Sequence, residues 1–294
     1  MTDRSSGRDE DGQAQPTGDA VGRRRRLAAA ARATRQRLRE RRRAEFGPPF
    51  DRRMALIALG ALALVGVLLP FDGRVKLAML DEPEGVRAFF GVATDVGLSA
   101  WYVYPSAALL LFIAFTDWRG MTRVGRRRVV SLYAHAFYLF ASVASAALLT
   151  QVLKTIFGRA RPALFDEEGP VAFRFFQLPH LYASFPSGHS TTMGAVTMVL
   201  MLWFKPLRIP VLLAGLCFAF SRVVVLAHYP SDVVAGFTIG ALVALTLARW
   251  LARRGILFGY DEAARGWAAL LPERVGNWRD FGVRTVLGRL RPGR

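Results

Sequence analysis

Long stretches without a charged side chain alternate with short, basic segments along this 294-residue chain. Such stretches suit the hydrocarbon core of a bilayer, which about 20 apolar residues cross as one helix. Because every backbone group in lipid must be bonded within its own segment, we expect helices rather than strands. The sequence therefore predicts an all-α fold, a bundle of six transmembrane helices over residues 54–71, 96–115, 129–153, 190–204, 209–227 and 233–250.

The distribution of basic residues sets the expected orientation of this bundle. Lys and Arg total 40 against 22 Asp and Glu, and the first 53 residues alone hold 15 arginines. Basic residues also crowd the connection 116–128 and the segment 251–294. Because basic segments stay on the cytoplasmic side of a membrane, we expect both termini in the cytoplasm. The connections 72–95, 154–189 and 228–232 are then expected on the outer face.

Three parts are expected along the chain: a basic tail over 1–53, a membrane domain over 54–254 and a cytoplasmic amphipathic tail over 255–294. The basic tail is expected to lie on anionic lipid headgroups, which attract each nearby basic residue by about 1 kcal/mol. Nucleic acid is a weaker alternative partner. The pair Arg52 and Arg53 also fits a cleavable signal, but the apolar run that follows is longer than usual, which favours a retained helix.

The composition gives little support to metal or cofactor chemistry. The one cysteine, Cys217, excludes an intramolecular disulfide and a zinc site built from several cysteines. Four histidines leave little for a histidine-rich metal site. We therefore expect no metal and no cofactor.

Polar clusters stand at the expected outer ends of the apolar segments, where charged side chains are costly and are functional candidates. Lys154 and Arg161 follow the third segment, and Arg222 lies near the end of the fifth. If these three cations meet, each close pair repels by about 4 kcal/mol at an effective dielectric near 20. They would therefore bind an anion with a charge near −2, such as a phosphate monoester.

The remaining cluster residues suggest how such an anion could be bound and attacked. Ser187 and Gly188 are expected to open a helix whose free N–H groups cradle an anion, although they could merely cap the helix and permit a turn. Asp232 lies four residues after His228 and could fix its tautomer, which leaves the other ring nitrogen as a nucleophile. His189, in the first turn of the facing helix, could protonate the departing oxygen.

Together the clusters resemble the type 2 phosphatidic acid phosphatase (PAP2) superfamily. The pattern Lys-x6-Arg-Pro, Pro-Ser-Gly-His and Ser-Arg-x5-His-x3-Asp is complete, at Lys154, Arg161, Pro162, Pro186, Ser187, Gly188, His189, Ser221, Arg222, His228 and Asp232. The resemblance implies a metal-independent phosphatase of the family's membrane branch, which shares its bundle with the soluble haloperoxidases. It implies a nucleophile at His228, oriented by Asp232, and a general acid and later base at His189. It further implies phosphate contacts from Lys154, Arg161, Ser187, Gly188 and Arg222.

The sequence thus predicts a bacterial inner-membrane enzyme that hydrolyses a lipid phosphomonoester or diphosphate at the outer, periplasmic face. Phosphatidic acid, phosphatidylglycerophosphate, a polyprenyl diphosphate and a lipid A phosphate all stay open as substrates. A phosphotransferase with the same site is an alternative, and an anion transporter is a much less favoured one. Aromatic residues between the first two clusters could guide the lipid or form an ordinary interfacial belt: Phe165, Phe173, Phe175, Phe176, Tyr182 and Phe185.

Overall fold

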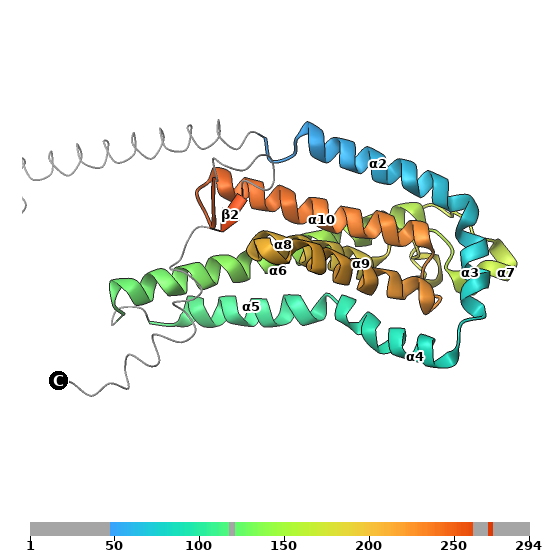
Figure 1. Cartoon of the computed structure of the whole chain (residues 1–294), viewed down its shortest axis with the longest axis horizontal. Helices are drawn as coiled ribbons and strands as arrows, with labels where there is room; N and C mark the ends of the chain where they lie inside the picture. Colours follow the sequence, from blue (N-terminus) through green and yellow to red (C-terminus); the bar gives the residue numbers. More distant parts are fainter. Residues whose placement is uncertain (1–47, 118–120, 261–269, 273–294) are drawn as a thin grey trace, which may run out of the picture.

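The computed structural model describes residues 48–117, 121–260 and 270–272 (Figure 1). Most of this part of the chain is helical, as the sequence predicts, and a short antiparallel pair of strands follows the last helix. The longer elements are α2 (Arg52–Leu68), α3 (Asp72–Leu80), α4 (Glu84–Ala93), α5 (Ala100–Phe115), α6 (Arg123–Phe157), α8 (Gly188–Trp203), α9 (Arg208–Val224) and α10 (Pro230–Arg253). The short ones are η1 (Leu69–Phe71), η2 (Thr94–Gly97), η3 (Pro162–Leu164), α7 (Phe165–Glu168), η4 (His180–Tyr182), η5 (Lys205–Leu207), β1 (Phe258–Tyr260) and β2 (Leu270–Pro272).

The longest helix, α6, extends beyond its predicted segment at both ends. It begins within the basic run, because arginine is a good helix former and Thr122 caps the first turn by accepting a hydrogen bond from the Gly125 N–H at 3.1 Å. It ends at Gly158, whose left-handed φ of 54° is typical of a helix C-terminus. The methyl group of an alanine there would lie 1.6 Å from the Arg174 carbonyl oxygen, so only glycine fits.

The segment 72–95, expected only as an outer connection, is largely helical. α3 continues from α2 through η1, and α4 leads through η2 towards α5. α3 lies across one end of the bundle, beside α7 and the start of α10 (Figure 1). This placement buries Asp72 completely, which a solvated connection would not do.

Five stretches are long and apolar enough to cross a membrane: Arg52–Leu80, Glu84–Phe115, Val124–Phe157, Lys205–Val224 and Pro230–Arg253. The chain is therefore a multi-pass membrane protein. The remaining long helix, α8, has 16 residues and rises about 24 Å, which is less than the hydrocarbon core of about 30 Å. It packs against α6, α9 and α10 and is buried along most of its length. The count of six spans and the cytoplasmic termini thus stay predictions.

α8 and α10 pack against each other in the centre of the bundle (Figure 1). A methyl group on Gly194 would lie 1.9 Å from the Phe237 carbonyl oxygen, and one on Gly240 would lie 1.9 Å from the Thr191 carbonyl oxygen. Helices in lipid associate through close packing rather than through a hydrophobic driving force, so small residues at the crossing are needed. The two glycines therefore hold the N-terminal halves of α8 and α10 together.

The predicted tails lie mostly outside the described residues. Of residues 1–53 the structure describes 48–53, where Asp51 caps α2 and pairs with Arg249 at 2.5 Å. Of residues 255–294 it describes 255–260 and 270–272, which include β1 and β2.

Candidate active site

The ends of four helices meet at one end of the bundle and bring the predicted site residues together. The Ser187 N–H at the start of α8 donates a hydrogen bond to the Asp232 carbonyl oxygen in α10 at 3.1 Å. Gly236 makes this approach possible, because a methyl group there would lie 2.4 Å from the Ser187 carbonyl oxygen. Arg161, which follows α6, reaches the loop after α9 by donating to the Ala227 carbonyl oxygen at 3.5 Å.

Lys154 and Arg161 form a pair of cations whose partners are neutral. The Lys154 ammonium is buried and donates to the Ala183 carbonyl oxygen at 2.5 Å. Arg161 donates to the same oxygen at 3.4 Å and to the His180 carbonyl oxygen at 3.0 Å. The charge of Arg161 lowers the pKa of the His180 side chain, and Lys154 adds to this effect. The two cations thus create a positive field that an anion would neutralise.

Arg222 supplies a third cation from the last turn of α9. Its Nη1 donates to the Thr94 hydroxyl in η2 at 3.1 Å, and its buried Nε has no partner among the described residues. Its charge acts on Lys154 and on His189, so all three cations lie within electrostatic reach of one another. An unpartnered, buried N–H on a guanidinium is costly unless a ligand accepts from it.

The start of α8 is open towards these cations. Ser187 is the N-cap, as predicted, and its hydroxyl accepts from the Ser190 N–H at 3.4 Å. A methyl group on Gly188 would meet only the Lys154 Cε atom, at 3.7 Å. The first N–H groups of α8 are therefore accessible beside Lys154, which is the arrangement that binds anions at helix N-termini.

His228 and Asp232 lie together in the buried wall of the site. The His228 Nδ1 atom is 3.6 Å from the Asp232 Oδ2 atom and 3.5 Å from the Ser184 hydroxyl. Ser184 donates to the same Asp232 oxygen at 2.6 Å, and so does the Tyr229 N–H at 2.9 Å. A shift of a few tenths of an ångström would bring the imidazole into hydrogen-bond range of the carboxylate, and such bonds are often long before a substrate binds.

The environment of His228 keeps its imidazole neutral. Burial lowers the pKa of His228 to about 3, and the charges of Lys154 and Arg161 add to this effect while Asp232 opposes it. A neutral ring with one nitrogen directed at a carboxylate has a free electron pair on its other nitrogen. The ring can therefore act as a nucleophile at neutral pH.

His189 lies at the start of α8, against η2. A methyl group on Gly97 would lie 3.0 Å from His189 Cβ and 3.2 Å from its Cδ2 atom. The charges of Arg222, Lys154 and Arg161 all act on the His189 ring, so this ring lies near the three cations. This position allows proton exchange with a group bound among them.

The lipid A 1-phosphatase of Rhizobium johnstonii is 35% identical to this chain over 228 residues, which cover 77% of this chain and 91% of that protein. A family model described as the PAP2 superfamily matches residues 135–256. This chain belongs to the PAP2 superfamily. The lipid A 1-phosphatase of Rhizobium etli is 36% identical over 213 residues, 72% of this chain and 88% of that protein. The predicted resemblance is confirmed, and the chain is a membrane phosphatase, a phosphoric ester hydrolase.

A solved PAP2 structure is also similar to this chain. It is a transmembrane PAP2-type phosphatidylglycerolphosphate phosphatase from Bacillus subtilis, with 21% sequence identity and a TM-score of 0.45. The similarity covers 65% of this chain and 91% of that one.

Several residues that contact the PAP2 motif residues were not predicted from the sequence. Ser184 contacts Asp232, and Thr94 and Gly97 contact Arg222 and His189. Thr94 lies 128 residues from Arg222 in the chain, and no spacing rule connects the two. For Ser184 a signal existed, since it lies just before the Pro-Ser-Gly-His motif.

Four of the six aromatic residues between the first two PAP2 motifs form two groups. Phe173 and Phe185 pack edge-to-face with Phe157, at ring-centroid distances of 6.5 and 5.2 Å. These two side chains therefore pack against the end of α6 beside the site. Phe175 and Phe176 are 60% and 74% exposed. Of the six residues of the predicted rim, these two are therefore the exposed ones, and their contact with lipid stays a prediction.

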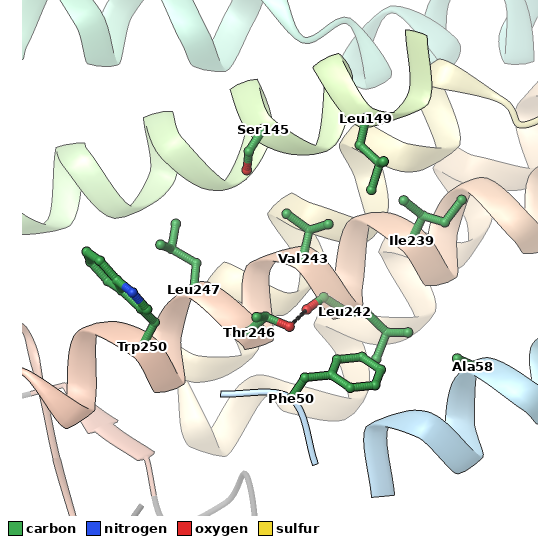
Figure 2. A pocket seen from close by; sticks show the side chains of 10 residues that line it. All are labelled: Phe50, Ala58, Ser145, Leu149, Ile239, Leu242, Val243, Thr246, Leu247 and Trp250. Atoms are coloured by element: carbon green, nitrogen blue, oxygen red, sulfur yellow. Dashed lines mark hydrogen bonds between the residues drawn. The ribbon is translucent and has the colours of Figure 1, made fainter. Parts of the chain in front are cut away.

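A separate cavity of about 500 Å3 lies between α2, α6 and α10 (Figure 2). Its lining is apolar apart from Ser145 and Thr246, whose hydroxyls donate to carbonyl oxygens of their own helices. Because it contains no titratable side chain, this cavity offers none of the groups needed for phosphate binding. Within the described ranges, no group of three or more His, Cys, Asp or Glu side chains is arranged to hold a metal ion.

Proposed function

We propose that this PAP2 enzyme removes a phosphate from a lipid headgroup through a covalent phosphohistidine at His228. The observation that carries the proposal is the meeting of three cations, an open helix N-terminus and the buried pair of His228 and Asp232. The cations and the helix end suit a dianionic phosphate, and the pair supplies a neutral nucleophile beside it.

The phosphate oxygens would dock among Lys154, Arg161 and Arg222. The Arg222 Nε group would donate to one oxygen, which satisfies its unpartnered N–H. The Gly188 N–H would donate to another oxygen at the positive end of α8, next to the Ser187 hydroxyl. Charge that develops on these oxygens in the transition state is then stabilised by donors already in place.

In the first step the Nε2 atom of His228 attacks phosphorus, and the bond between phosphorus and the lipid oxygen breaks. Burial and the three cations lower the pKa of His189 to about 4, but the charge of the bound phosphate offsets that of the cations and lets the ring carry a proton. His189 donates this proton to the leaving oxygen, so the lipid departs as an alcohol or, from a diphosphate, as a monophosphate. Asp232 accepts the hydrogen bond from Nδ1–H and stabilises the positive charge that forms on the ring.

In the second step water hydrolyses the phosphohistidine. His189, now neutral, accepts a proton from the attacking water. The bond between phosphorus and Nε2 breaks, inorganic phosphate is released, and His228 returns to its neutral form. Apart from the substrate and the attacking water, both steps use only side chains of this protein, so we expect activity to persist in the presence of a metal chelator.

A lipid A 1-phosphate is the first candidate substrate. Two relatives that carry this name match most of the chain at 35% and 36% identity. The exposed Phe175 and Phe176 stand next to the segment that binds Arg161, where the acyl chains of a bound lipid would lie. Phosphatidic acid, phosphatidylglycerophosphate and a polyprenyl diphosphate are the comparison substrates.

The site is assigned to the periplasmic face of the inner membrane. The support is the charge distribution, since the basic segments 1–53, 116–128 and 251–294 would all be cytoplasmic when the motif end of the bundle is outside. Modification of a single cysteine introduced at Phe176 by a membrane-impermeant thiol reagent, in a Cys217→Ser background, tests the assignment. Labelling only after the membrane is opened would place the site inside.

The basic tail over 1–53 is assigned to the anionic surface of the cytoplasmic leaflet, since its 15 arginines would each gain from nearby lipid charge. A peptide of residues 1–53 should bind vesicles that contain phosphatidylglycerol, and it should dissociate from them as the salt concentration is raised. Salt-dependent binding to duplex DNA, with no binding to these vesicles, would favour nucleic acid instead.

The proposed activity is tested with purified enzyme in detergent and a panel of these lipids. We expect release of inorganic phosphate, fastest from lipid A 1-phosphate, and no release by His228→Ala. His180→Ala is the matched control, because its backbone contact to Arg161 is retained. Transfer of the phosphate to an added lipid alcohol would identify a phosphotransferase. Anion transport into liposomes without phosphate release would identify a transporter.

A further inference from the structure

Arg159 lies within the first PAP2 motif but is not directed at the phosphate site. Its side chain is completely buried, and all five of its N–H groups have protein partners. Nη1 donates to the Ser231 hydroxyl at 2.7 Å and to Asp232 Oδ1 at 2.5 Å. Nη2 donates to Asp72 Oδ2 at 2.8 Å, and Nη2 and Nε both donate to the Pro170 carbonyl oxygen. No donor is left for a phosphate oxygen.

Asp72 closes this arrangement from the first turn of α3. Its carboxylate accepts from the Ser231 N–H at 3.1 Å, from the Ser231 hydroxyl and from Arg159. Asp72 and Asp232 thus bind the same guanidinium from two sides, and all three groups are fully buried. Removing Arg159 would leave two uncompensated carboxylates in the protein interior.

The arrangement determines what Asp232 can offer to His228. One carboxylate oxygen, Oδ1, is bound by Arg159, and the other, Oδ2, faces Ser184, Tyr229 and the His228 ring. If Asp232 were paired with Arg159 alone, the two opposite charges would cancel, and little negative charge would act on the His228 imidazole. The second carboxylate, Asp72, leaves the buried set with one net negative charge.

We propose that Arg159 and Asp72 are positioning residues, which fix the Asp232 carboxylate and preserve its charge so that His228 is held as the Nδ1–H tautomer. The inference rests on the proposed function, because it assigns the support of the proposed nucleophile. It also separates Arg159 from Lys154 and Arg161 of the same motif, which are left to bind the substrate phosphate.

Two variants test this assignment. Arg159→Lys keeps the positive charge but cannot bridge both carboxylates, because an ammonium lacks the planar fork. Asp72→Asn keeps the shape but removes the second negative charge. The matched controls are Arg174→Lys, at an arginine of the same segment whose side chain is 56% exposed, and Asp81→Asn, at an exposed carboxylate at the end of α3.

For both variants we expect kcat to fall about 10- to 100-fold, with KM and the inhibition constant of vanadate, a phosphate analogue, unchanged. The controls should match the wild type. In 15N spectra of histidine-labelled enzyme, where His228→Ala identifies the His228 signal among four histidines, the wild type should show one tautomer and the variants a mixture.

Three results would overturn the inference. Weaker vanadate inhibition in Arg159→Lys would make Arg159 a phosphate ligand. An unchanged His228 tautomer, or kcat values equal to those of the controls, would reduce the pair to a purely structural role. If Arg159→Lys or Asp72→Asn does not fold, kcat, vanadate inhibition and the His228 tautomer are measured in Ser231→Ala instead. This variant removes one hydroxyl and no charge. The His228 tautomer is observed without turnover. Its measurement therefore still tests the roles of Arg159 and Asp72 if the wild type releases no phosphate from any lipid.

Discussion

Replacing Gly97 by alanine should disturb the general acid without touching the phosphate ligands. The new methyl group would lie 3.0 Å from His189 Cβ and 3.2 Å from Cδ2. Unstrained carbon contacts are about 3.5–4.0 Å, so the ring must move by about 0.5 Å. A misplacement of about 1 Å can cost about 100-fold in rate, so we expect kcat to fall about tenfold. KM should stay close to the wild-type value, because the three cations keep their positions.

The assay is phosphate release by purified protein in detergent, with thermal unfolding measured in parallel. Gly91→Ala is the matched control, because the added methyl group in α4 meets nothing within 4 Å. We expect the control to retain full activity and Gly97→Ala to remain folded. A normal kcat in Gly97→Ala, or a rise in KM alone, would refute the placement of His189 as the acid.

Three further predictions follow from the same geometry. His228 should not titrate between pH 5 and 8 in NMR spectra, because its pKa in the folded protein, about 3, lies below the ordinary 6.5. Its contribution to the free energy of unfolding is therefore lost as the pH falls from 6.5 towards 3. Arg222→Lys should raise KM and the vanadate inhibition constant about tenfold or more, because the unpartnered Nε donor is lost. Gly240→Ala should lower the free energy of unfolding by about 3 kcal/mol, because its methyl group would overlap the Thr191 carbonyl oxygen, whereas Gly66→Ala on the exposed side of α2 should have little effect.

The approximate positions of the long apolar helices could be predicted from the sequence, whereas the count of six spans and the roles of the site residues at the helix ends stay predictions. Long uncharged segments have few stable alternatives to helices in lipid, so their approximate positions follow from hydropathy alone. Pro230 at the first turn of α10 and the N-cap at Ser187 could also be predicted, because both depend on local backbone chemistry. The boundaries were less predictable, since α6 continues through a basic run that hydropathy treats as a loop.

The support of the site could not be predicted from the sequence. Asp72 binds Arg159 across 87 residues, and its segment reads as an outer connection. Thr94 and Gly97 are ordinary residues, and they gain a role only because η2 packs against α8 and α9. Such contacts depend on how the helices pack in three dimensions, which neither hydropathy nor motif spacing records.

The fate of the phosphate during turnover tests the central claim most directly. Enzyme mixed with a lipid that carries a radiolabelled phosphate, quenched rapidly in alkali, should contain an alkali-stable, acid-labile label on His228, located by mass spectrometry. His228→Ala should contain no label and release no phosphate. Turnover without a labelled protein, a label on another residue, or phosphate release by His228→Ala would contradict the account.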